Sequence, residues 1–289
     1  MTDWMDLTRR ASFASHRLLG WIFWDERARA NLAALGVPDG MGHYITNRGA
    51  PLAAAGPDAV TAAFFSIRRE FVHFALNHAS PHITNWHDVT VARDAAVREG
   101  LLEMTPEILE PLGAMSARLW DVVDTLPGDG RVLFAAHRAW PRPDDDVMSA
   151  WNALNCIREW RGDTHWAVLI NDGIGAVEAG LLHDAWMGYP KEWIPRSRGA
   201  DDDMIARALA TLASRGYVTD GAVNDDGVAY RQRVEERTDE LCGTPWQLLG
   251  AASTGEFLDL VEPIGDIFLD HINNTAGDHW MPAARERRR

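Results

Sequence analysis

Apolar side chains recur at the spacing of an α-helix along most of the chain. The first such stretch covers residues 4–35 and ends at Gly36 and Pro38, because glycine and proline stop helices. A connector over residues 40–42 and a turn over residues 47–52 should follow. Further helices are predicted over 57–76, 88–102, 106–125, 146–160, 164–171, 174–187, 201–215, 227–241, 245–250 and 255–272. The pattern therefore predicts a mainly α fold.

One stretch departs from this all-helical pattern. The helix predicted over residues 201–215 is followed by two short apolar segments on either side of Asp220-Gly221, a dipeptide typical of tight β-hairpins. A long helix follows and ends near Cys242. The order helix, strand, strand, long helix is that of a winged helix, so we expect a small β-wing near residues 217–224.

The segment 131–146 is rich in proline and acidic residues, and it is predicted to be a linker. It would separate an N-terminal helical domain with a degenerate helix-turn-helix, residues 1–130, from a C-terminal winged-helix-like domain, residues 147–289. A short internal echo supports two related halves. The sequence Arg48-Gly49-Ala50 precedes the helix at 57–76, and Arg198-Gly199-Ala200 precedes the helix at 201–215.

Three stretches carry a resemblance to a known family: Arg48-Gly49-Ala50-Pro51-Leu52, the segment 135–141, and Arg158-Glu159-Trp160-Arg161-Gly162-Asp163-Thr164-His165. Together they resemble an actinobacterial family of helix-turn-helix proteins, similar to regulators of the multiple-antibiotic-resistance type. The resemblance implies a mainly α fold with tandem winged-helix-like halves. It also leaves open a homodimer, since the long helix after the wing often joins two subunits in such regulators. It implies no particular reaction, because a fold does not define a function.

Net charge argues against a DNA-binding face. The chain has 28 Lys plus Arg against 42 Asp plus Glu, which gives a net charge of −14. The helix that would read bases begins with Asp201-Asp202-Asp203, and carboxylates repel phosphates. The one dense basic run, Arg285 with Arg287-Arg288-Arg289, is predicted to be a solvated tail. Nucleic acid is therefore a disfavoured partner, although another face of the protein leaves that alternative open.

A row of side chains in the second half is the candidate site. Trp151, Leu154, Arg158, Arg161 and His165 are spaced 3, 4, 3 and 4, so they form one row if the helix continues past Gly162. If Gly162 breaks the helix, Asp163 becomes the N-cap of the next one. On the following helix, Glu178 lies among apolar positions and would pair with these cations.

The functional interpretation assigns a role to each of these groups. Arg158 and Arg161 would anchor an anionic group, since guanidinium matches a carboxylate or phosphate. His165 would be the acid or base, oriented by Asp163 or Glu178. Further substrate contacts are predicted for Trp151, His137 and Trp140. Two alternatives stay open: a salt-bridge cluster that only fixes helix packing, or a weaker metal site formed by Asp163, His165, Glu178 and His183.

Other chemistry finds little support in the sequence. Two cysteines, Cys156 and Cys242, are too few for a disulfide scaffold or a cysteine-rich metal site, and no metal is predicted. No phosphate-binding glycine loop, dinucleotide fingerprint or nucleophile elbow occurs, so the cofactor is unknown. Because no apolar run is long enough to span a membrane and no signal pattern opens the chain, we expect a cytoplasmic protein without a membrane partner.

These observations favour a small-molecule-binding protein whose ligand is a small anionic aromatic or apolar metabolite held between the two halves. Whether it is also an enzyme, using acid–base chemistry without a cofactor, is left open. The alternatives are a ligand-responsive winged-helix transcriptional regulator and a purely structural interaction protein. Thirteen tryptophans suit either a packed core or an aromatic-walled pocket.

Overall fold

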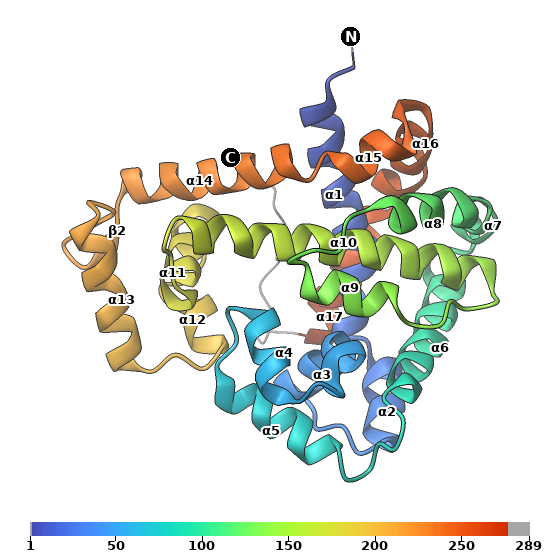
Figure 1. Ribbon diagram of the computed structural model, residues 1–289, viewed down its shortest axis with the longest axis horizontal. Coiled ribbons are helices and arrows are strands. Elements are labelled where there is room, and N and C mark those ends of the chain that lie inside the picture. Colours follow the sequence, from blue (N-terminus) through green and yellow to red (C-terminus); the bar gives the residue numbers. More distant parts are fainter. Residues whose placement is uncertain (1, 277–289) are drawn as a thin grey trace.

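A computed structural model describes residues 2–276, and within them the protein is mainly α-helical (Figure 1). The helices of the first half are α1 (Trp4–Gly20), α2 (Glu26–Ala34), α3 (Met41–Ala53), α4 (Pro57–Phe64), α5 (Arg69–Ala79), α6 (His87–Met104), α7 (Leu109–Ala114), α8 (Ser116–Thr125) and α9 (Val132–Arg138). The second half contains α10 (Asp146–Asn171), α11 (Ala176–Met187), α12 (Trp193–Ser197), α13 (Asp202–Ser214), α14 (Asp225–Leu241), α15 (Thr244–Leu249), α16 (Ala251–Val261) and α17 (Gly265–Ala276). Short 3-10 turns lie at Trp21–Phe23, Pro106–Ile108 and Glu262–Ile264. The predicted fold class is confirmed.

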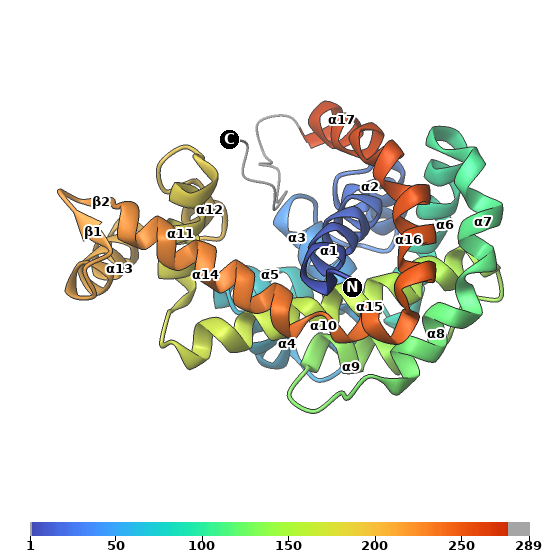
Figure 2. The same cartoon turned by 90° about the horizontal axis from the view of Figure 1, so that it is seen from above.

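The predicted wing is also confirmed. After α13, strands β1 (Val218–Thr219) and β2 (Ala222–Val223) form the one sheet of the described residues, and they are antiparallel. Asp220 and Gly221 have φ angles of 50° and 74°, as a two-residue hairpin with positive φ at both central positions requires. Both views show α13 and the hairpin at one end of the molecule, joined to the main helical body by the long α14 (Figures 1 and 2).

Helix α10 is the central element of the fold. It is 26 residues long and begins at Asp145, whose side chain accepts a hydrogen bond from the Met148 amide. The helix does not break at Gly162 but runs on to Asn171. It therefore passes α7, α8 and α9 at one end and α14 farther along, and it crosses the middle of the view in Figure 1. Successive turns of one helix thus meet quite different neighbours.

Two stretches differ from the sequence-based expectation. The supposed turn at 47–52 lies within α3, which contains Pro51 in its last turn although proline removes one backbone hydrogen bond from a helix. Gly49 allows close packing here, because an added Cβ would lie only 3.1 Å from Val60 and 3.2 Å from Phe64 of α4. Tertiary packing therefore overrides weak helix propensity here.

The segment 131–146 is the second difference. It contains α9, whose Leu133 and Phe134 are fully buried, and this helix packs on α10. Part of the expected linker is therefore core structure, although the division of the chain into domains on either side of it stays a prediction. No helix within residues 2–276 is both long enough and apolar enough to cross a membrane. The predicted arginine tail over 285–289 lies outside the described residues.

The main hydrophobic core forms where α1, α8, α10, α15 and α16 meet. Three tryptophans, Trp21, Trp151 and Trp246, are its largest apolar side chains, and each is almost completely buried. A separate cluster is formed around Leu182, Leu212 and Val234. It packs α11, α13, the β-hairpin and α14 together, and we call these elements the wing unit. Two further clusters lie in the first half of the chain, one around Val60 and Val72 and one around Leu32 and Val89.

Candidate functional site

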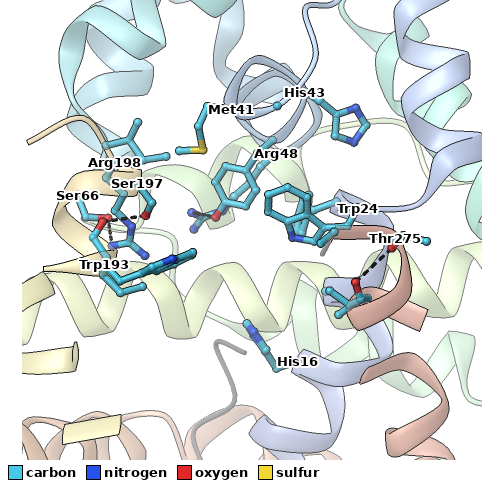
Figure 3. Close-up of a pocket in the computed structure, with 18 of the residues that line it drawn as sticks. His16, Trp24, Met41, His43, Arg48, Ser66, Trp193, Ser197, Arg198 and Thr275 are labelled. Carbon is cyan, nitrogen blue, oxygen red and sulfur yellow. Dashed lines mark hydrogen bonds between the residues drawn. The ribbon is translucent and has the colours of Figure 1, made fainter. Parts of the chain in front are cut away.

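A large cavity lies between the two halves of the chain. Its volume is about 740 Å³, and its walls come from α1, α3, α17 and the turns on either side of α12 (Figure 3). Six arginines and one lysine lie on these walls, whereas Asp39 is the one carboxylate among the described lining residues. The cations of the wall are Arg17, Arg29, Arg48, Arg158, Lys191, Arg196 and Arg198. A cationic cavity is unexpected in a protein whose net charge is −14.

Most outer cations of the wall are paired on the surface. Arg29 donates two hydrogen bonds to Asp39, at 2.9 and 2.5 Å. Arg196 pairs with Glu192 and with Asp202, at 2.7 and 2.8 Å. These pairs are largely exposed, so they contribute little to stability. Each of these cations is already neutralised by its carboxylate partner. The inner cations are different.

Arg48 and Glu159 form the buried ion pair at the inner end of the cavity. Arg48 Nε donates to Glu159 Oε1 at 2.9 Å, and Nη2 donates to Oε2 at 2.7 Å, which is the bidentate geometry of a strong pair. Burial alone would raise the pKa of Glu159, but Arg48 and Arg158 outweigh it and hold that pKa well below its ordinary value. The carboxylate therefore stays charged.

The Glu159 carboxylate also forms an ion pair with Arg158. Arg158 Nη1 donates to Glu159 Oε1 at 2.5 Å, and the guanidinium lies over the Phe23 ring, 5.3 Å from its centre. Its Nε is buried and has no hydrogen-bond partner among the described residues. Two guanidinium groups thus share one carboxylate.

Arg198 adds a third guanidinium from the turn before α13. Its Nη1 donates to Ser66 Oγ at 2.6 Å, and Figure 3 shows both side chains at one end of the cavity. No carboxylate within residues 2–276 forms an ion pair with it. Burial, with a further contribution from Arg48, outweighs the opposing influence of Tyr44 and Asp184 and lowers the pKa of Arg198 below its ordinary value, so the compensation of this cation is incomplete. We call Arg48, Arg158, Arg198 and Glu159 the cavity cluster.

Tyr44 lies among these three guanidinium groups. Its hydroxyl oxygen accepts a hydrogen bond from Arg48 Nη1 at 3.2 Å. Burial raises the pKa of this phenol, but Arg48, Arg158 and Arg198 together lower it below its ordinary value. All three cations therefore act on the position of one oxygen atom.

The turn that carries Ser66 is strained. Phe65 has a φ of 54° and a ψ of −56°, and the Ser66 amide donates to the Phe64 carbonyl at 2.5 Å. This geometry is a γ-turn of the strained kind, which a large side chain seldom adopts. The Phe65 ring stacks on Trp166 of α10 at 4.9 Å between centres, and this contact holds the turn in place. Strain of this kind concentrates at binding sites.

The opposite end of the cavity is neutral and largely aromatic. Trp24, His43 and Thr275 lie there in Figure 3, away from Arg198. Burial lowers the pKa of His43 to about 4, so the ring is neutral at physiological pH. Its Nε2 is buried without a hydrogen-bond partner among the described residues. Arg29 and Asp39, which act electrostatically on His43, neutralise each other, so the cavity is polarised, with its cationic cluster away from this end.

The residues predicted from the sequence fall into separate places. Arg158 lines the cavity, but Arg161 does not. Arg161 Nη2 donates to Glu235 at 2.6 Å and also to Asp239, both on α14. Arg231 of α14 donates to the same Glu235, at 2.7 Å. We call Arg161, Arg231, Glu235 and Asp239 the α14 cluster, and it corresponds to the salt-bridge alternative left open by the sequence.

The three residues predicted to form an acid–base site, His165, Asp163 and Glu178, do not line the cavity either. His165 Nδ1 lies 2.9 Å from Thr238 Oγ1 of α14, at the interface between the two helices. Asp163 caps a helix, but not a following one, because its carboxylate accepts the Phe134 amide of α9 at 2.9 Å. Burial raises the pKa of Asp163 to about 7. Glu178 lies in the first turn of α11 against Gly175, and it forms no ion pair with Arg158, Arg161 or His165.

The predicted aromatic and histidine contacts lie behind the cavity wall. Trp151 is a core residue whose indole N–H donates to the Leu18 carbonyl at 3.3 Å. His137 Nε2 donates to the Arg48 carbonyl at 3.0 Å, and burial lowers the pKa of the ring to about 4. Trp140 packs beside His87, at 5.2 Å between ring centres. His137 therefore supports the helix that carries Arg48 rather than lining the cavity itself.

The face of the wing unit is as acidic as its sequence indicates. Asp201 caps α13 by accepting the Met204 amide at 2.9 Å, and Asp202 pairs with Arg196. Arg215, the basic residue at the end of α13, donates to the backbone carbonyls of Asp172 and Gly173. Among residues 2–276, no group of three or more His, Cys, Asp or Glu side chains is placed to hold a metal ion.

Sequence reasoning missed four residues of this site, namely Tyr44, Arg48, Glu159 and Arg198. Arg48 and Glu159 lie in two of the family-like stretches, and Arg48 and Arg198 are the arginines of the Arg-Gly-Ala echo. The echo therefore carried a usable signal, because both of its arginines reach the same cavity.

A sequence model described as a helix-turn-helix family matches residues 8–274, nearly the whole of the described chain. No match was found among curated proteins or among solved structures.

Proposed function

The chain belongs to the helix-turn-helix family, and from that premise we propose that it binds a small anionic organic molecule in the cavity between its halves. The observation that carries the proposal is the charge of the cavity cluster, in which two guanidinium groups share the Glu159 carboxylate and a third, that of Arg198, is bonded to the Ser66 hydroxyl instead. Buried charge that is not neutralised is costly, so an anionic ligand would stabilise this arrangement.

The size and walls of the cavity fit such a ligand. Small-molecule sites in proteins commonly enclose about 300–1,000 Å³, and most of their lining is apolar with a few charged groups. Here several aromatic side chains line the cavity, including Phe23, Trp24, Trp166 and Trp193. A flat aromatic or an apolar body would pack on these rings while its anionic group meets the arginines.

The proposal does not include a catalytic step. His165, Asp163 and Glu178 were predicted to form an acid–base set, but none of the three lines the cavity. His43 does line it, yet a pKa of about 4 makes its ring a weak base at neutral pH.

Ligand titration by calorimetry tests the proposal. We expect 1-naphthoate to bind to the wild-type protein, and we expect the Arg198→Gln variant to bind it about tenfold more weakly, because a charged hydrogen bond is lost. Arg196→Gln is the matched control, since Arg196 lies on the same wall but is paired with Glu192 and Asp202. Absence of binding to aryl carboxylates, sulfates and phosphates alike would refute the proposal.

A ligand-responsive transcriptional regulator is the second candidate. Family membership and the α13–wing–α14 unit favour it, and Arg198 precedes α13 by only a few residues. The acidic start of α13 argues against it. A gel-shift experiment with the upstream DNA of the gene, at two salt concentrations, separates the candidates. A regulator would give a sequence-specific, salt-sensitive shift that changes with ligand, whereas the first proposal requires none.

A further inference from the structure

The cavity cluster indicates how much charge the ligand carries. Resting on the function proposed above, we propose that the ligand bears one compact dianionic group of the phosphate monoester class, held at Tyr44 between Arg48, Arg158 and Arg198. The aromatic or apolar body of the ligand would then extend toward Trp24 and the neutral end of the cavity.

The charge count of the cluster is the first argument. Arginine stays protonated at physiological pH even when buried, so three guanidinium groups contribute three positive charges. Glu159 contributes one negative charge, because Arg48 and Arg158 keep it ionised. Within these four side chains the balance is an excess of two positive charges, and Asp163 and Asp184, which act electrostatically on Arg48 and Arg198, offset part of it because burial raises the pKa of each to about 7. A carboxylate or a sulfate ester would neutralise one of the positive charges, whereas a phosphate monoester carries nearly two negative charges above its second pKa of about 6.

The convergence of the three cations is the second argument. Arg48 is within hydrogen-bond distance of the Tyr44 hydroxyl, and the electrostatic influence of Arg158 and Arg198 reaches the same phenol. The three side chains come from different elements, α3, α10 and the turn before α13, yet they act on one point. A convergent arrangement suits one tetrahedral anion better than two separate carboxylates, which would need two distinct groups of cations.

Unused hydrogen-bond donors around this point are the third argument. The Nε of Arg158 is buried and unpartnered among the described residues, and the side chain of Arg158 is only 9% exposed. The indole N–H of Trp166, on the same wall, is also unpartnered among them. A buried donor that forms no hydrogen bond destabilises the folded protein. A phosphate group supplies three terminal oxygens that can accept them.

A comparison of two ligands with the same shape and different charge tests the inference. 1-Naphthyl phosphate and 1-naphthyl sulfate both present a tetrahedral group on the same ring system, but at pH 8 the phosphate is a dianion and the sulfate a monoanion. We expect calorimetry to show binding of the phosphate about tenfold or more tighter than that of the sulfate, because the second charge meets an uncompensated guanidinium in a low-dielectric site.

Variants show whether the cluster is the source of this preference. In Arg198→Gln the excess falls by one charge, so the ratio of the two affinities should fall to about twofold. Arg196→Gln, which leaves the cluster intact, should keep the wild-type ratio. Circular dichroism and thermal unfolding of each variant establish that it is folded before its titration is interpreted.

The possible results separate the two proposals. Equal affinity for phosphate and sulfate, with both bound, would overturn the dianion inference and leave the anion-binding function standing. The same holds if the phosphate preference survives in Arg198→Gln. If neither ester nor 1-naphthoate binds, both proposals fail together.

Discussion

The two ion clusters on α10 both consist of arginines and carboxylates, but they differ in the balance of positive and negative charges. In the α14 cluster, the guanidinium groups of Arg161 and Arg231 face two carboxylates, Glu235 and Asp239. In the cavity cluster, Arg48 and Arg158 share Glu159, and Arg198 forms no ion pair with a carboxylate of residues 2–276. Unpartnered N–H groups occur in both clusters, so they do not distinguish them. What separates the clusters is the charge balance and the adjoining space.

This difference assigns different roles to neighbouring residues of one helix. A balanced, buried cluster between α10 and α14 fixes how the wing unit packs on the main body. An unbalanced cluster beside a cavity of about 740 Å³ leaves charge and room for a ligand. Arg158 and Arg161 are only three residues apart, and yet one belongs to each cluster. The next predictions test this division, beginning with the largest effect.

Removal of Arg161 should strongly destabilise the protein. The change Arg161→Met removes the cation that pairs with both Glu235 and Asp239, and breaking a buried ion pair from one side costs about 3–5 kcal/mol of unfolding free energy. Denaturant unfolding followed by circular dichroism measures this cost. The double variant Arg161→Met/Asp239→Asn keeps the Arg231–Glu235 pair and should recover most of the stability. A loss below about 1 kcal/mol in the single variant would mean that the α14 cluster does not hold the interface.

Removal of Arg158 should affect ligand binding far more than folding. Glu159 keeps its bidentate partner Arg48 in the variant Arg158→Gln, so the unfolding free energy should change by about 1 kcal/mol or less. Affinity for 1-naphthoate should fall about tenfold, since a charged hydrogen-bond donor is lost. Calorimetry and denaturant unfolding on the same samples measure both quantities. The opposite result, a stability loss with unchanged affinity, would place Arg158 among the structural residues.

Asp163 lies on α10 two residues beyond Arg161, and burial outweighs the opposing influence of Arg48 on its carboxyl group. Burial raises its pKa to about 7 from the ordinary 3.8, so the folded protein holds a proton that the unfolded chain releases. The contribution of Asp163 to the unfolding free energy therefore decreases as the pH rises from 3.8 toward 7, and it changes little above pH 7. Between pH 6 and pH 8.5 the wild-type protein should lose about 1 kcal/mol more than Asp163→Asn.

Unfolding curves at the two pH values measure this difference directly. Asp184 also has a pKa raised to about 7, but it is present in both proteins and cancels in the comparison. The asparagine oxygen can still accept the Phe134 amide, so the cap on α9 is kept. Parallel pH profiles for the two proteins would show that Asp163 is ionised throughout this range.

Local signals explain which parts of the fold could be predicted. The wing was predictable because Asp220-Gly221 specifies a tight turn by itself. Helix α3 was not, since its glycines and Pro51 indicate a turn, and only packing of Gly49 against Val60 and Phe64 explains the helix. The same limit applies to the break between α4 and α5 at Phe65, where no glycine marks the positive φ.

The site was predictable only in part, for a related reason. A helical row indicated Arg158 correctly as a cavity residue but also included Arg161 and His165, because spacing cannot show that α10 meets α14 one turn later. Glu159 and Arg48 are 111 residues apart in the chain, and no local pattern joins them. The repeated Arg-Gly-Ala was the one long-range clue, and charge balance could be judged only in three dimensions.

The smallest predicted effect concerns the strained turn beside Arg198. At an ordinary position, alanine is more favourable than glycine, because glycine loses more backbone freedom on folding. At Phe65, with its φ of 54°, the order should reverse, and Phe65→Gly should be about 1 kcal/mol more stable than Phe65→Ala. Both variants lose the same stacking on Trp166, so their difference isolates the backbone strain. If denaturant unfolding shows alanine to be the more stable variant, the turn that positions Ser66 against Arg198 is not strained, and the cavity cluster is held by its side-chain contacts alone.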